Sequence, residues 1–151
     1  MNLEQYKEYA NKIKESIFKG YYCDAEKILL ELDKNKQRDV IMNLAYDTES
    51  ISVYSFLRYM SEKNRTQFWL ELIIDVMINP LCFIEGAYST ALFHTRELLK
   101  MNSSVANMER ILFFYNIPEK LVGHTEAELV AKEIISIEPN NAAALSSKMF
   151  C

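Results

Sequence analysis

Glycine and proline are nearly absent from this chain, because each occurs only three times in 151 residues. A β-sandwich or an α/β fold of this length reverses direction at many tight turns, and those turns most often require glycine or proline. Half of the residues are hydrophobic and a quarter are charged, which is typical of a folded protein. The sequence therefore predicts an all-α fold whose helices are joined by short polar links.

Apolar residues recur at helical spacing along the chain. Leu3, Tyr6, Ala10, Ile13 and Ile17 form the first stripe, which ends at Gly20. Further helices are expected at about residues 24–32, 38–46, 50–61, 65–78, 80–101, 103–115, 125–138 and 141–149. Short links force consecutive helices to run antiparallel, so we expect stacked helical hairpins in a single domain covering residues 1–151.

Local signals set several of these boundaries. Ser50 is an expected N-cap, Ser103 or Ser104 is expected to cap the helix that follows them, and Thr125 with Glu128 has the spacing of a capping box. Pro80 is expected to begin a long helix that contains Gly86, with a neighbouring element packed close to that glycine.

Charge is distributed unevenly, although the net charge is only −4. There is no lysine or arginine between Thr66 and Thr95, and the three acids of that segment are Glu71, Asp75 and Glu85. A second stretch, residues 116–141, holds five acids and two bases. A surface of one sign attracts partners of the opposite sign. The three acids of the base-free segment are therefore the first candidates for binding a partner.

Asp47 and Glu49 are the next candidates, because they lie in the expected link before residue 50 and links carry function more often than buried faces do. For Glu71 and Asp75 an alternative stays open. With Gln67 they are spaced four apart, so they form one narrow polar stripe, which is also what an otherwise buried helix presents to solvent.

No motif for chemistry is present. His94 and His124 stand apart without HxxxH, ExxH or CxxC spacing, and no glycine-rich loop occurs, so we expect no metal, no cofactor and no catalytic residue. The three cysteines, Cys23, Cys82 and Cys151, are odd in number and are expected to be buried or inert thiols in a reducing cytosol.

Nucleic acid and membrane are not expected as partners. No basic run supplies phosphate contacts. The charged N-terminus does not resemble a signal peptide, and the apolar run 68–93 is interrupted by acids and by Pro80.

Two segments resemble the tetratricopeptide repeat, a helical-hairpin unit. The stretch 20–25 reads Gly-Tyr-Tyr-Cys-Asp-Ala, followed by Leu29 and Leu32 at packing positions. Near the C-terminus, Ala127, Ala131, Ile134 and Pro139 match the second half of the repeat, and residues 38–101 are more similar to irregular HEAT-type pairs. This resemblance implies a degenerate α-solenoid; the alternative is an ordinary helical bundle.

In size, acidity and helical build, and in its base-free segment, the chain also resembles the all-helical immunity proteins that protect bacteria from contact-delivered toxins. This resemblance implies a monomeric protein without enzymatic activity, which forms a heterodimer with a cognate toxin, commonly a nuclease, and covers its active site. The alternative is a helical-repeat adaptor that binds a peptide or protein segment in a concave groove.

Overall fold

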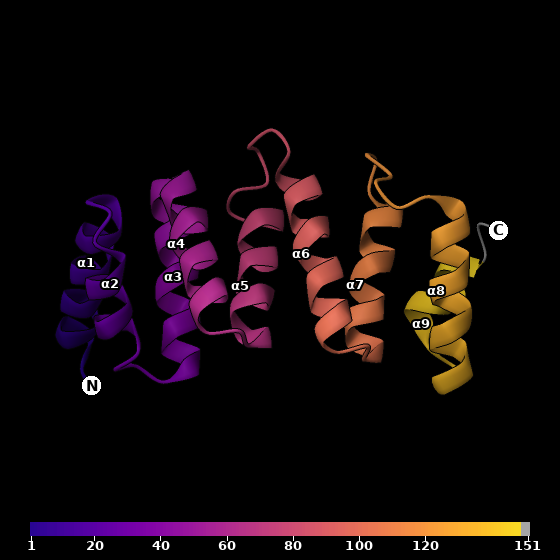
Figure 1. Ribbon diagram of the computed structural model, residues 1–151, viewed down its shortest axis with the longest axis horizontal. Coiled ribbons are helices and arrows are strands. Elements are labelled where there is room, and N and C mark those ends of the chain that lie inside the picture. Colours follow the sequence, from indigo (N-terminus) through magenta and orange to yellow (C-terminus); the bar gives the residue numbers. More distant parts are fainter. Residues whose placement is uncertain (149–151) are drawn as a thin grey trace. The chain divides into compact units, whose positions relative to one another are not determined.

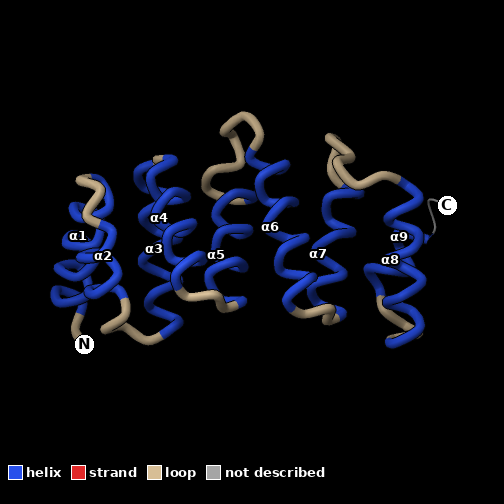
Figure 2. Tube along the Cα trace, in the orientation of Figure 1, coloured by secondary structure: helices blue, strands red, loops and turns tan. Residues whose placement is uncertain are grey.

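The computed structural model describes residues 1–148, and all regular structure in that range is helical (Figures 1 and 2). This confirms the predicted all-α class. The expected end of the last helix at Met149 lies outside the described residues, as does Cys151. The helices are α1 (Leu3–Phe18), α2 (Tyr22–Leu29), α3 (Lys34–Thr48), α4 (Ile51–Lys63), α5 (Gln67–Ile78), α6 (Ala87–Met101), α7 (Val105–Asn116), α8 (His124–Ile137) and α9 (Ala142–Lys148).

By their contacts the helices form two compact units. The first unit, Met1–Glu85, holds α1 to α5, and the second unit begins at Gly86 and holds α6 to α9. Within each unit consecutive helices run antiparallel, as the short links predict (Figure 1).

The core of the first unit is built from apolar faces of all five helices. Ile13 and Ile17 of α1, Phe56 of α4 and Trp69 of α5 are almost completely buried. α5 buries seven of its twelve residues, which explains its nearly continuous apolar sequence. The packing positions that carry the repeat resemblance in this unit, Ala25, Leu29 and Leu32, are buried as well.

The second unit is organised around α7, which contacts α6, α8 and α9. Phe114 of α7 is fully buried, and the positions Ala127, Ala131 and Ile134 of α8 are covered by their neighbours. In α9 only Ala144 and Ser147 are buried among the described side chains, and Leu145 is exposed. Asn141 holds the start of α9: its side chain accepts from the Ala144 amide at 3.0 Å and donates to Glu109 of α7 at 2.6 Å.

The expected helix from Pro80 is wrong, because residues 79–86 form turns and α6 begins only at Ala87. Gly86 has φ +82, a left-handed conformation that cannot lie inside a right-handed helix. The close neighbour expected at Gly86 is absent too, since a Cβ built there would meet no described atom within 4 Å. The glycine is required by its backbone angle and not by packing.

Of the expected caps, those of the serines are confirmed and the capping box is wrong. Ser50 accepts from the Ser52 amide at 3.1 Å and Ser104 from the Asn107 amide at 3.2 Å. α8 instead begins one residue before Thr125, with Gly123 at the N-cap and no side-chain cap. The first apolar stripe also fails at its start, because Leu3 is exposed.

Candidate partner-binding site

Asp75 is not a free acid. Its carboxylate accepts a 2.7 Å hydrogen bond from the guanidinium of Arg38, and its side chain is only 18% exposed. The expectation that this acid has no compensating base is therefore wrong. Arg38 lies in α3, 37 residues earlier in the chain, so a search of neighbouring sequence cannot find it. Asp75 ties α5 to α3 and is removed from the candidate site.

Glu71 lies one turn before Asp75 on the same helix and is half-buried. No ion pair joins it to another residue in the described part of the chain. It is the one acid of the polar stripe on α5 that is available to a partner.

The other three candidates lie at one end of the first unit, where α3 and α5 both finish (Figure 1). Asp47 lies in the last turn of α3 and not in a link as expected, Glu49 is the C-cap of α3, and Glu85 lies in the turn segment after α5. All three side chains are exposed. We refer to Asp47, Glu49 and Glu85 as the acidic end.

The backbone adds negative charge to the acidic end. A helix C-terminus carries partial negative charge, which a basic residue in the last turn commonly offsets. Neither α3 nor α5 has such a residue. Glu49 moreover adopts φ +51, a left-handed conformation that costs a side-chain-bearing residue about 1 kcal/mol. Charge and backbone conformation are thus both unfavourable at this residue.

Sequence reasoning missed an exposed aromatic residue two positions before Glu85. Phe83 is 61% exposed in the turn segment that also carries Glu85. The expected helix over residues 80–101 concealed it, whereas residues 79–86 form turns. An exposed phenylalanine next to a carboxylate is a typical anchor for a protein partner.

Two acids of the second unit pair with basic side chains. The carboxylate of Glu126 accepts hydrogen bonds from two guanidinium nitrogens of Arg96, and Glu128 pairs with Lys132 at 3.1 Å. Arg96 lies outside residues 116–141, so counting charge within that stretch overstated its acidity.

A groove runs between α1 and α3 of the first unit and encloses about 340 Å³. Residues 6–14 of α1 and 40–48 of α3 supply its lining, and Asp47 is the only one of the five acidic candidates among them. The repeat resemblance implies a groove, but nothing in the sequence alone selects the residues that line it.

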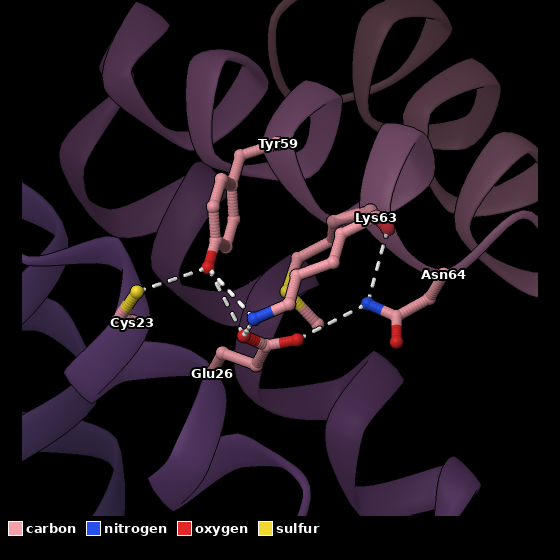
Figure 3. Close-up of polar contacts among 6 residues, drawn as sticks. Cys23, Glu26, Tyr59, Lys63 and Asn64 are labelled. Carbon is pink, nitrogen blue, oxygen red and sulfur yellow. Dashed lines mark hydrogen bonds and ion pairs between the residues drawn. The ribbon is translucent and has the colours of Figure 1, made fainter.

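The densest polar network of the first unit surrounds Glu26 of α2 (Figure 3). Its carboxylate, 8% exposed, accepts from the ammonium of Lys63 at 2.7 Å, the hydroxyl of Tyr59 at 3.0 Å and the amide of Asn64 at 3.2 Å. Burial raises the pKa of Glu26, but these hydrogen bonds outweigh burial and hold that pKa below its usual value. A carboxylate whose oxygens are occupied in this way is suited to holding α2 on α4.

Of the two alternatives expected for the cysteines, buried or inert, burial is wrong for both described thiols, since Cys23 and Cys82 are exposed. Cys23 Sγ lies 3.3 Å from the Tyr59 hydroxyl. Either atom can be the donor in this contact, and the Tyr59 hydroxyl also donates to Glu26 at 3.0 Å. This hydrogen bond is the main cause that raises the pKa of Tyr59.

The two histidines occupy different surroundings. His94 is fully buried, and its Nδ1 lies 2.7 Å from the carboxylate of Glu97. His124 is half exposed, with Nδ1 3.2 Å from the Tyr115 hydroxyl. In the described range no three His, Cys, Asp or Glu side chains are grouped so that they could hold a metal ion.

None of the described helices is both long enough and apolar enough to span a bilayer. Comparisons of the chain with protein-family models, with curated proteins and with solved structures find no match.

Proposed function

We propose that this protein is an immunity protein: a cytoplasmic binding protein without enzymatic activity of its own, which neutralises a basic protein toxin, such as a nuclease, by covering its active site. The observation that carries the proposal is Glu49. A glutamate there combines a left-handed backbone with a negative charge at a helix C-terminus, two terms that lower stability. Residues that weaken the fold in this way are typical of functional surfaces.

The acidic end has the chemistry of an interface for a basic partner. Its exposed carboxylates attract cations to a helix end that is already negative. Phe83 offers apolar area that a partner can bury, and Glu71 adds a further carboxylate on α5. A nuclease, whose active site attracts phosphate, has a surface of the complementary sign.

Charge reversal tests this proposal. The ligand is the C-terminal domain of a toxin encoded directly beside the gene of this protein, made catalytically inactive, and affinity is measured by calorimetry. The double variant Glu49→Lys, Glu85→Lys is expected to weaken binding by roughly 2–4 kcal/mol, because it replaces attraction by repulsion at two positions. Glu4→Lys is the matched control, since Glu4 is exposed in the first turn of α1 and does not belong to the acidic end.

Glu49→Gly separates binding from folding. Glycine adopts positive φ without strain, so the variant is expected to gain about 0.5–1 kcal/mol in the free energy of unfolding while it binds the toxin more weakly. Equal affinities for the wild type and all three variants, or the absence of any toxin gene beside this one, would remove the proposal.

The α1–α3 groove supports a second candidate function, that of an adaptor which holds a segment of another protein. Its ligand need not be a toxin and need not be basic.

A further inference from the structure

The α1–α3 groove has an apolar floor and polar walls. Val40 and Leu44 of α3 are buried beneath it, and Ala10 of α1 is half-buried. Exposed polar side chains stand above this floor on both helices: Lys7, Asn11 and Lys14 on α1, and Asn43 and Asp47 on α3. A ligand that fits must therefore place apolar groups on the floor and polar groups against the walls.

The α1 wall carries two available positive charges. Lys7 and Lys14 lie seven residues apart, which puts them on the same face of the helix with a rise of roughly 10 Å between them. Neither ammonium group has an ion-pair partner in the part of the chain that the structure describes. Lys12 of the same helix, by contrast, pairs with Glu8 at 3.0 Å.

Two amide side chains also line the groove. Asn11 lies one turn after Lys7 on α1, and Asn43 lies across the groove on α3. A carboxamide both donates and accepts hydrogen bonds. This capacity matches an extended polypeptide, whose backbone N–H and C=O groups have no partners within their own segment.

We propose that this groove binds an extended acidic segment of a protein, with Lys7 and Lys14 each engaging one carboxylate. A segment in the extended polyproline II conformation has three residues per turn and advances about 3.1 Å per residue, so carboxylates three positions apart lie on the same face and are separated by roughly 9 Å, close to the spacing of the two lysines. The residues between them place apolar side chains on Val40 and Leu44. Asp47, on the α3 wall, repels acids there, so both carboxylates of the ligand face α1.

This site differs from the acidic end in the sign of the ligand. The proposed toxin is basic and meets Glu49 and Glu85, whereas the groove selects acidic segments through Lys7 and Lys14. The two proposals can therefore fail separately, provided that the groove is tested without altering Asp47, which belongs to both surfaces.

The probe is a fluorescein-labelled peptide with two aspartates three positions apart and leucine and valine between them. Binding is followed by fluorescence anisotropy and by amide chemical shifts of isotopically labelled protein. The peptide is expected to shift amide signals of residues 6–14 and 40–48, and the matching peptide with two asparagines is expected to bind roughly tenfold more weakly. Added salt is expected to weaken only the aspartate peptide.

Protein variants complete the test. The double variant Lys7→Gln, Lys14→Gln is expected to lose the roughly tenfold preference for aspartate, while Lys27→Gln, an exposed lysine of α2, keeps it. Equal binding of the two peptides to the wild type overturns the proposal. So does an unchanged preference in the double variant, or stronger displacement of the peptide by a short oligonucleotide than by unlabelled peptide, which would indicate a site for phosphates.

Discussion

Glu26 is nearly covered by protein and still favours its ionised form, because its oxygens receive donors from Lys63, Tyr59 and Asn64. Replacing it by glutamine removes the charge. It also places an amide N–H group, which can only donate, against side chains that already donate hydrogen bonds. Glu26→Gln is therefore expected to lower the free energy of unfolding by roughly 1 kcal/mol at pH 7, measured in urea. The value is modest because Lys63 is half exposed and its charge is screened by water.

The pH dependence of this effect has a defined sign. Hydrogen bonding lowers the pKa of Glu26 in the folded state, so its stabilisation is present above the unfolded pKa of about 4.3 and is lost as pH falls through the folded pKa. The difference between wild type and Glu26→Gln should then vanish in strong acid. Glu62→Gln is the control, since Glu62 pairs with Arg58 at an exposed position, where an ion pair adds little to the free energy of unfolding. Equal losses in both variants would contradict this account.

Individual side chains show where sequence reasoning stops. The acids Asp75 and Glu126 were predicted to lie on uncompensated surfaces, and each meets an arginine at least 30 residues away in sequence. The base-free segment correctly singled out Glu71 and Glu85 as acids without an ion pair among the described residues. Local composition describes the charge of a segment, whereas tertiary packing decides which segments share a surface.

At the scale of the helix, periodicity predicted the existence of the elements but not all of their ends. The apolar stripes at 3.6-residue spacing follow directly from burial on one face, so α1 to α5 were found within a few residues. The boundary at α6 failed because proline at position 80 suggests a helix start, while the left-handed angle of Gly86 is invisible in the sequence.

Gly86 provides a test at this scale. Gly86→Ala introduces a Cβ at φ +82 in open space, so only backbone strain opposes it, and the free energy of unfolding is expected to fall by about 1 kcal/mol. Gly123 is the matched control, because it is also an N-cap in open space but has φ −78. Gly123→Ala should change stability by no more than about 0.5 kcal/mol. Similar losses in urea unfolding of both variants would show that strain is not the cause.

Across the whole molecule the net charge of −4 conceals a separation of sign within the first unit. Carboxylates gather where α3 and α5 end, and available lysines line the α1 wall of the groove. Asp47 belongs to both surfaces. A basic protein is expected at the first surface and an acidic segment at the second, which is an arrangement that the total charge could not suggest.

The rate of association is the property through which the acidic end should act most directly. Exposed charges at an interface rim mainly change how fast two proteins meet, and salt screens them beyond about 8–10 Å. For the proposed basic toxin, stopped-flow measurements should show an association rate constant that falls about tenfold or more between low and physiological salt. The dissociation rate should depend instead on the burial of Phe83.

Variants separate the two effects. In Glu49→Lys, Glu85→Lys the salt dependence of the association rate should flatten or reverse. Phe83→Ala should leave that salt dependence unchanged and speed dissociation. An association rate that salt does not alter in the wild type would mean that charge at this end does not guide the partner.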